Sequence, residues 1–260
     1  MTRTYSVVIP AYNAERTIEA CLASVALQTL VPLEVLVVDD ASRDGTEGSV
    51  HRCAERLAAA GTTLRYFRQP HNAGPSAARN KGILEAAGSH IAFLDADDTW
   101  RADKLAIVDR FASEPGTGLI CHAYTEAADF ASADGAPHGA RPLSVPAMLL
   151  RNPAQTSCAV VCRQSDVRFD EAMRYCEDHD LWLRIAERST VLQLVGGALT
   201  RLGRPQLSAG GLSGDRMRMR SGEARVYYRF CRRAWLSRAW VLPFLLLMSF
   251  AKHLYSGLRR

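Results

Sequence analysis

The first 94 residues alternate β-rich runs with helical patterns, and this order restricts the fold more than any other feature of the sequence. Strands are expected at 5–10, 33–38, 63–68 and 90–94, and helices at 14–30, 46–60 and 76–87. A repeated strand–helix–strand order predicts a parallel, right-handed α/β sheet. The run 33–38 is apolar almost throughout, as expected for a strand covered on both faces.

The fourth expected strand leads straight into a cluster of carboxylates. Ile91–Leu94 is followed by Asp95, Asp97 and Asp98. Asp-x-Asp places two side chains on one side of an extended backbone, and such charge at a sheet edge is costly unless a cation is bound. Oxygen ligands suit Mg²⁺ or Mn²⁺, which bind one or two carboxylates together with substrate phosphates. The alternative is a plain acidic turn, with Asp98 or Thr99 capping the next helix.

Polar clusters follow all four strands, at 10–13, 39–40, 71–80 and 95–98. In a parallel α/β sheet these clusters converge beyond the carboxyl ends of the strands, where ligands bind. A nucleotide or phosphate site is therefore expected at that edge. The sequence has no G-x-G-x-x-G after the first strand and no G-x-x-x-x-G-K-[ST], one of which a dehydrogenase or P-loop enzyme would be expected to show.

The motifs that are present resemble those of the family 2 glycosyltransferases, which have the GT-A fold. The matching segments, in the same order and spacing, are 7–13, 37–46, 72–82, 93–98 and 177–184. The resemblance covers roughly residues 4 to 205 and implies an α/β, Rossmann-like, mostly parallel sheet flanked by helices. We expect a nucleotide-sugar-binding half at 1–100 and an acceptor-binding and catalytic half at 101–215 of the same domain. The composition, not the resemblance, sets residues 216–260 apart as a basic, aromatic and Leu-rich tail that associates with a membrane.

The resemblance implies that a set of residues in the first half binds a UDP-sugar. These are Pro10, Ala11, Tyr12, Asp39, Asn72, Arg79, Asp95 and Ala96. Tyr12 would line the uracil pocket, Asp39 would accept the imide N–H, and Asp95 would meet the ribose. Asn72 and Arg79 would approach the base and the diphosphate. The alternatives are an aromatic packed on its own helix, a helix-capping aspartate and a solvated arginine.

The resemblance also implies the chemistry. Asp97 would hold Mn²⁺ or Mg²⁺, which with arginine stabilises the leaving UDP. Asp178 would remove the proton from an acceptor hydroxyl in a single, inverting displacement, and Glu177 is the second candidate for this base. Acidic residues in a first helical turn also favour the helix dipole, so Glu177, Asp178 and Asp180 have a purely structural alternative.

Two departures from the family pattern limit what carries over. No Gln-x-x-Arg-Trp motif occurs, so we expect one sugar to be added per encounter. The segment 200–205 lacks the histidine that many non-processive members place near the metal. Arg201 or Arg204 could neutralise the diphosphate instead.

The remainder of the second half gives weaker signals. Helices are expected at 100–111 and 177–188 and a strand at 155–162, whereas 112–155 shows little periodicity and includes an exposed loop at 131–137. No signal peptide precedes the first strand, so we expect the active site to face the cytoplasm. Seven cysteines without zinc-ligand spacing indicate reduced thiols.

The last sixty residues carry thirteen Lys or Arg and two acids, a formal charge of +11. A basic helix is expected at 217–238, followed by the apolar run 240–251, whose twelve residues are too few to span a bilayer. This composition fits a segment lying in an anionic membrane interface. The alternatives are a buried helix, or a basic tail for nucleic acid, for which the sequence has no accompanying motif.

Together these observations predict an inverting, metal-assisted glycosyltransferase, peripheral on the inner face of a bacterial membrane. It would transfer a sugar from UDP to a lipid-linked glycan precursor of an exopolysaccharide or lipopolysaccharide, and bind no nucleic acid. The alternatives are a transferase that uses a GDP- or dTDP-sugar and a catalytically idle nucleotide-sugar-binding scaffold. The intact Asp95, Asp97, Glu177 and Asp178 argue against the idle scaffold.

Overall fold

The structure is a computed structural model. It describes residues 3–112, 116–130, 139–163, 167–204, 215–234 and 238–258. The loop expected at 131–137 lies outside these ranges, as do Trp235 and Leu236 of the expected basic helix.

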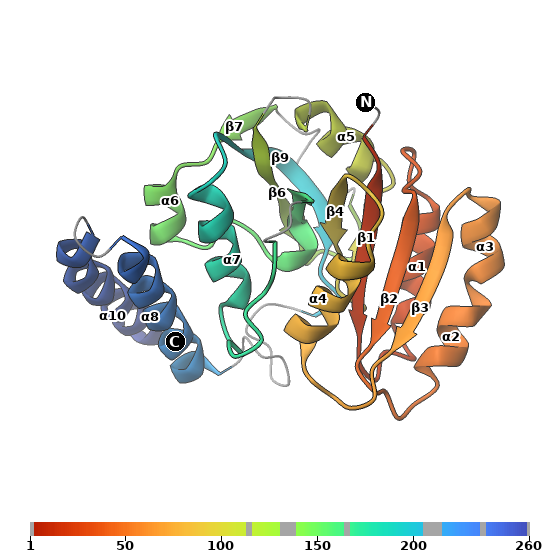
Figure 1. Ribbon diagram of the computed structural model, residues 1–260, viewed down its shortest axis with the longest axis horizontal. Coiled ribbons are helices and arrows are strands. Elements are labelled where there is room, and N and C mark those ends of the chain that lie inside the picture. The colour runs from red at the N-terminus through yellow and green to blue at the C-terminus, as the bar shows by residue number, and fades with distance from the viewer. Residues whose placement is uncertain are drawn as a thin grey trace.

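One mixed sheet forms the centre of the described chain (Figure 1). Its strands, in spatial order, are β3 (Thr63–Arg68), β2 (Glu34–Asp39), β1 (Tyr5–Ala11), β4 (His90–Phe93), β8 (Ala159–Cys162), β6 (Thr117–Thr125), β9 (Val191–Arg201) and β5 (Thr99–Trp100), while β7 (Ala140–Pro142) pairs with β9. The first four are parallel, and β8 runs antiparallel to both β4 and β6. The predicted parallel α/β core is confirmed.

Helices cover both faces of the parallel part. They are α1 (Ile18–Ala26), α2 (Thr46–Arg52), α3 (Ala54–Ala59) and α4 (Pro75–Glu85), so the helix expected at 46–60 is interrupted at Cys53. Successive strand residues point to opposite faces. Val7 and Ile9 therefore pack with the cluster that contains Ile18, whereas Val8 packs with the cluster that contains Ile83 of α4.

The second half differs more from expectation. The helix expected at 100–111 is α5 (Lys104–Phe111), because Trp100 instead pairs with Thr200 in the sheet. A 3-10 turn (Thr156–Cys158) occupies the start of the strand expected at 155–162. The stretch 112–155, which shows little periodicity, contains β6 and α6 (Val145–Leu150). α7 (Glu177–Ala186) agrees with the expected catalytic helix.

The tail forms α8 (Arg216–Arg233), a short 3-10 turn (Ala239–Val241) and α10 (Leu242–Leu258), at the end of the molecule opposite α2 and α3 (Figure 1). α8 packs on the domain: Val226 and Tyr227 are buried, and the Tyr227 hydroxyl donates a hydrogen bond of 2.8 Å to the Leu149 carbonyl. One face of the expected basic helix is therefore packed against the domain, whereas Phe244, Leu247 and Phe250 of the apolar run are more than half exposed. Among the described residues, no helix has both the length and the apolarity needed to cross a membrane.

Candidate active site

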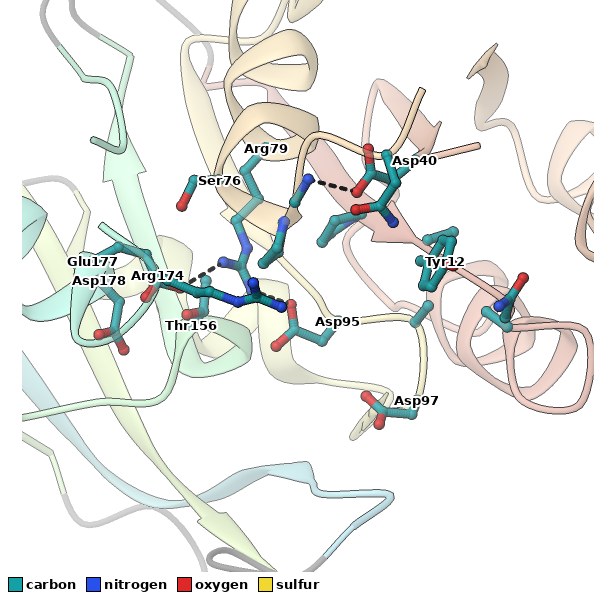
Figure 2. A pocket seen from close by; sticks show the side chains of 18 of the residues that line it. Tyr12, Asp40, Ser76, Arg79, Asp95, Asp97, Thr156, Arg174, Glu177 and Asp178 are labelled. Carbon is teal, nitrogen blue, oxygen red and sulfur yellow. Dashed lines mark hydrogen bonds and ion pairs between the residues drawn. The ribbon is translucent and has the colours of Figure 1, made fainter. Parts of the chain in front are cut away.

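A cavity of about 1160 Å³ opens beyond the carboxyl ends of β1 and β4 and extends to the start of α7 (Figure 2). Eleven of the thirteen residues expected in a nucleotide, metal or catalytic role line it. They are Pro10, Ala11, Tyr12, Asn72, Arg79, Asp95, Ala96, Asp97, Glu177, Asp178 and Arg204. The predicted convergence of strand ends therefore produces one site, and Asp39 and Arg201 are the expected residues that do not line it.

Asp39 is fully buried and does not line the cavity, and both of its carboxylate oxygens have partners within the protein. It accepts hydrogen bonds from the Ser42 N–H at 2.8 Å, the Tyr66 hydroxyl at 2.5 Å and Arg68 Nη1 at 3.1 Å. This placement does not fit the expected contact with uracil. Its neighbour Asp40 lines the cavity instead.

Asp40 shapes the cavity wall through the backbone. Its two carboxylate oxygens accept the Ala73 and Gly74 N–H groups, each at 2.7 Å. Ala41 next to it has a φ of 60°, a conformation rare for a residue with a side chain, which ends β2 sharply. These contacts hold the loop that carries Asn72 into the cavity.

Two partly exposed carboxylates follow β4. Asp95 Oδ1 accepts a hydrogen bond from Arg79 Nη2 at 2.7 Å, and Asp97 Oδ2 lies 3.1 Å from Arg204 Nε. Burial and the charge of Asp95 raise the pKa of Asp97. Two carboxylates of like charge beside one cavity are the type of donor set that favours a bound divalent cation.

Asp98 has a structural role different from helix capping. It accepts hydrogen bonds from Ser157 Oγ at 2.6 Å and from the Gly203 N–H at 3.0 Å, whereas Asp103 is the residue that precedes α5. Burial, with repulsion from Asp95, raises its pKa to about 7. Asp98 thus joins the β4 turn to the segment that presents Arg204.

Arg79 of α4 is almost completely buried, so the solvated alternative is wrong. Besides Asp95, its guanidinium contacts Glu177 Oε1 at 3.2 Å and lies 5.3 Å from the centre of the Phe169 ring. Arg79 therefore links the β4 turn to the first turn of α7, and its charge is shared by two carboxylates of the chain.

Glu177 and Asp178 begin α7 on the opposite wall from Asp97, after Cys176 in the left-handed conformation with φ 58°. Asp178 accepts hydrogen bonds from Asn152 Nδ2 at 3.1 Å and from the His179 N–H at 2.7 Å. Burial raises the pKa of Asp178. Burial and the charge of Asp178 raise the pKa of Glu177 to about 7, while Arg79 opposes the shift. Two adjacent carboxylates with raised pKa values suit proton transfer near neutral pH.

Asp180, by contrast, faces away from the cavity. Its side chain is completely buried and pairs with Arg184 Nε at 2.9 Å, so its role is a structural ion pair. Arg201 also points elsewhere, since it donates to the Ala128 carbonyl at 2.6 Å and to Thr99 Oγ1 at 3.2 Å. Of the two arginines expected at the diphosphate, Arg204 alone lines the cavity.

The cavity also contains residues that the sequence reasoning missed. Asn13, Asp40, Ser76, Thr156, Arg174 and Tyr175 line it. Arg174 comes three residues before Glu177, in a segment without periodicity, and the resemblance to the family pointed only to the neighbouring carboxylates. Its charge and its nearness to Glu177 were the available signals.

Among the described residues, no three His, Cys, Asp or Glu side chains come together as a metal site. Asp95 and Asp97 are the two carboxylates after β4 that line the cavity and could hold a divalent cation. That set fits Mg²⁺ or Mn²⁺, which commonly takes one or two carboxylates and completes its shell with substrate phosphates and water.

Comparisons with known proteins agree with this geometry. Residues 6–163 match the profile "Glycosyl transferase family 2". The chain is 30% identical over 196 residues to the amylovoran biosynthesis glycosyltransferase AmsB of Erwinia amylovora, covering 70% of this chain and 63% of that protein. It is 39% identical over 100 residues to the Escherichia coli protein WfgD, a UDP-Glc:α-D-GlcNAc-diphosphoundecaprenol β-1,3-glucosyltransferase, covering 38% of this chain and 37% of that protein. The chain thus spans less than two thirds of either relative.

Solved structures show the same fold. Residues 1–349 of Staphylococcus aureus TarS superpose with a TM-score of 0.71 at 19% identity, covering 96% of this chain and 71% of that one. A mannosyltransferase from Pyrobaculum calidifontis, solved with GDP-Man and Mn²⁺, superposes with a TM-score of 0.67 at 20% identity, covering 96% of this chain and 74% of that one. The chain has the GT-A fold, and by its profile match it belongs to the family 2 glycosyltransferases.

Proposed function

We propose that this protein transfers a sugar from a UDP-sugar to a hydroxyl of a lipid-linked glycan precursor, with inversion at the anomeric carbon. The observation that carries the proposal is that Asp178 and the pair Asp95 and Asp97 line opposite walls of one cavity. A donor diphosphate at Asp97 leaves its sugar between the two walls, where an acceptor hydroxyl can approach from the side of Asp178.

In the proposed reaction, the acceptor oxygen attacks the anomeric carbon as the bond from that carbon to the diphosphate breaks. The Asp178 carboxylate takes the hydroxyl proton, and the electron pair of the broken bond leaves on UDP. Asp97, with Asp95 beside it, would hold Mg²⁺ or Mn²⁺, whose positive charge would stabilise the leaving diphosphate. Asn152 orients Asp178 by its hydrogen bond, and Arg79 keeps Glu177 close to Asp95.

The choice of uridine is supported by the donors named for related proteins. WfgD is named for UDP-Glc, and TarS has been solved with UDP-GlcNAc, although the mannosyltransferase was solved with GDP-Man. In this chain, Pro10, Tyr12 and Asn72 line the cavity and would surround the base. A screen of UDP, GDP and dTDP by thermal shift with Mn²⁺ tests the donor, since a ligand specific for the folded state raises its melting temperature. UDP is expected to give the largest shift.

The lipid-linked acceptor is supported by the name of WfgD and by the tail. Trp240 and, on α10, Phe244, Leu247 and Phe250 are more than half exposed, at helical spacing. With the net positive charge of the tail, this apolar surface suits attachment to an anionic bilayer, where such an acceptor resides. We therefore place the enzyme on the inner face of the membrane.

Release of UDP decides between an enzyme and an idle scaffold. Slow hydrolysis of a UDP-sugar with Mn²⁺ and without acceptor is expected from an enzyme, because water can replace the acceptor hydroxyl. A protein that binds UDP in the thermal-shift screen and yet releases none from any UDP-sugar, with or without glycan acceptor, would contradict the proposed reaction.

A further inference from the structure

We infer that Arg174 is a diphosphate-binding residue of this site, and that α8 of the tail holds it in position. The inference rests on the proposed function, because it assigns to Arg174 the charged part of the proposed donor. It goes beyond the proposed function by adding a residue that precedes the catalytic helix, and by giving the C-terminal helix a role in the active site.

The first observation is that some arginines of the cavity are already paired with carboxylates of the protein, whereas Arg174 is not. Arg79 is shared between Asp95 and Glu177, and Arg204 is paired with Asp97. In the described part of the chain, Arg174 has no carboxylate within ion-pair distance although it lines the same cavity. In Figure 2 its side chain extends from the Glu177 side toward Asp95. An exposed guanidinium without a protein partner is available for a ligand anion.

The second observation is that the turn carrying Arg174 is held by several contacts. Asp170 Oδ1 accepts the Ala172 N–H at 2.9 Å, and Met173 donates its N–H to the Asp170 carbonyl at 3.0 Å. The Met173 side chain is buried in the core cluster beneath α7. A turn fixed on both sides of Arg174 loses little entropy when the arginine binds, which favours preorganised binding.

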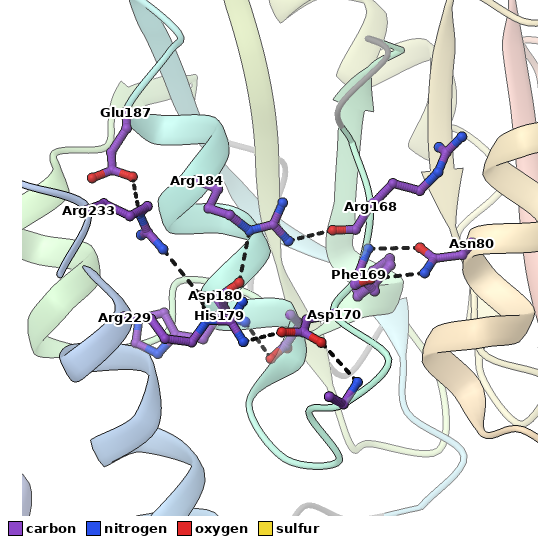
Figure 3. Close-up of polar contacts among 12 residues, drawn as sticks. Asn80, Arg168, Phe169, Asp170, His179, Asp180, Arg184, Glu187, Arg229 and Arg233 are labelled. Atoms are coloured by element: carbon purple, nitrogen blue, oxygen red, sulfur yellow. Dashed lines mark hydrogen bonds and ion pairs between the residues drawn. The ribbon is translucent and has the colours of Figure 1, made fainter. Parts of the chain in front are cut away.

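The third observation is that α8 supplies most of the remaining contacts of this turn. Arg229 pairs with Asp170, and Arg225 Nη1 donates to the Ala172 carbonyl at 3.2 Å (Figure 3 shows Arg229 reaching Asp170). Cys176 Sγ lies 3.5 Å from the Met219 carbonyl. The turn is therefore held between α7 and α8.

Gly222 allows α8 to pack closely against the backbone of Tyr175. A Cβ atom at this position would lie 2.8 Å from both the Cβ and the carbonyl oxygen of Tyr175, closer than such atoms pack. Glycine thus lets α8 contact the backbone directly after Arg174. A larger residue at 222 would push this backbone, and with it the arginine.

The chemistry expected of Arg174 follows from its planar fork of N–H donors. Such a fork binds phosphate oxygens in two parallel charge-assisted hydrogen bonds. Charge grows on the diphosphate as the sugar leaves, so a guanidinium there stabilises the transition state more than the bound substrate. Arg174 would thereby add to Arg204, the arginine of the segment 200–205 that lines the cavity, whereas Arg201 points elsewhere.

Calorimetric titration of the full chain with UDP and with uridine, in Mn²⁺, tests the inference. Arg174→Gln is expected to weaken UDP binding by about 10-fold or more, as for the loss of a charged hydrogen bond, and to leave uridine binding unchanged. Arg232→Gln, an exposed arginine of α8 outside the cavity, is the matched control and is expected to bind both as the intact chain does. Gly222→Ala, if folded by its melting curve, is expected to reproduce part of the loss for UDP alone.

Equal UDP affinity of Arg174→Gln and the intact chain would overturn the inference, and so would an equal loss for UDP and uridine. A change confined to the Michaelis constant of a diphosphate-linked acceptor, with UDP affinity intact, would also overturn it. An intact chain that binds neither UDP nor another nucleoside diphosphate contradicts the proposed function itself. The two failures are thus separable.

Discussion

The two walls of the cavity are held in place by different kinds of interaction. On the donor wall, Asp95 and Asp97 follow a strand that is paired on both sides within the sheet. On the catalytic wall, Glu177 and Asp178 lie on a helix that reaches the sheet through side chains and rests on α8. The first wall depends on backbone hydrogen bonds, whereas the second depends on packing and ion pairs with the tail.

The ion pairs of the catalytic wall are concentrated around Asp180 (Figure 3). This buried carboxylate accepts Arg184 of its own helix and lies 3.5 Å and 3.4 Å from Arg229 and Arg233 of α8. Arg233 also pairs with Glu187 at 2.6 Å. This difference makes the tail a structural part of the active site. Changes in α8 should therefore affect catalysis more strongly than binding of the nucleotide base.

The largest effect is expected on the turnover number, when the proposed base on the catalytic wall is replaced. Asp178→Asn keeps the shape and can still accept from Asn152, but it cannot take the proton of the acceptor. The turnover number is expected to fall by about 10²–10⁴-fold, the usual contribution of a general base. Steady-state release of UDP in the presence of acceptor measures it. Turnover equal to that of the intact chain would remove Asp178 from the mechanism.

A second substitution tests how the catalytic wall is supported. Asp180→Ala leaves three arginines around an empty site and is expected to lower the free energy of unfolding by about 2–3 kcal/mol. This is less than for a fully buried pair, because the three arginines are partly exposed. Urea unfolding gives the value, with Glu19→Ala of the exposed Glu19–Arg52 pair as control, expected within about 0.5 kcal/mol. Similar costs for the two variants would mean that the network does not support α7.

A third substitution tests the outer surface of the tail. Leu247 is 66% exposed on α10, so Leu247→Asn is expected to keep the melting temperature of the intact chain. Its affinity for vesicles containing anionic lipid is expected to fall by about 5–10-fold, since one leucine no longer enters the interface. Co-sedimentation at low and high salt measures the affinity. Unchanged sedimentation of this variant at high salt, where charge attraction is screened, would count against the apolar surface as the attachment site.

The smallest expected effect concerns the pH dependence of the catalytic wall. Asp178 acts as a base only when ionised, and its pKa is raised, so activity should be lost as the pH falls through that raised pKa. Glu177→Gln removes a negative neighbour and is expected to move this acid limb of the kcat/KM profile to lower pH. Glu177 and Asp178 titrate as a pair, so the profile reports their combined behaviour. An acid limb that stays in place would show that Glu177 does not influence the titration, and loss of activity at every pH would show that Glu177 is the base.

The donor wall could be predicted almost residue by residue, because its side chains follow strand ends whose order the alternation of the sequence determines. The error within it, Asp39, has a simple reason. The two consecutive aspartates at the end of β2 point in different directions. Tyr66 and Arg68 from the neighbouring strand β3 donate hydrogen bonds to Asp39, the first of the two. The sequence of β2 alone does not indicate which of the two aspartates is buried and which lines the cavity.

The catalytic wall was predicted less completely, because its contacts join segments far apart in the chain. Glu177 and Asp178 were identified by resemblance, but Arg174 is placed by α8, more than forty residues later. The positive charge of α8 predicted contact with an anionic membrane surface. In the structure, Arg229 and Arg233 instead pair with buried or half-buried carboxylates of the protein. The role of a charged helix is set by its partner, which the local pattern does not contain.

The division of the cavity into a donor wall and a catalytic wall is tested most directly by calorimetric titration of UDP, in Mn²⁺, into Asp97→Asn and Asp178→Asn. Loss of the carboxylate that we propose to bind the metal is expected to weaken UDP binding by about 10-fold or more, whereas Asp178→Asn should bind UDP as the intact chain does. The opposite pattern, with UDP affinity lost in Asp178→Asn and kept in Asp97→Asn, would contradict the account.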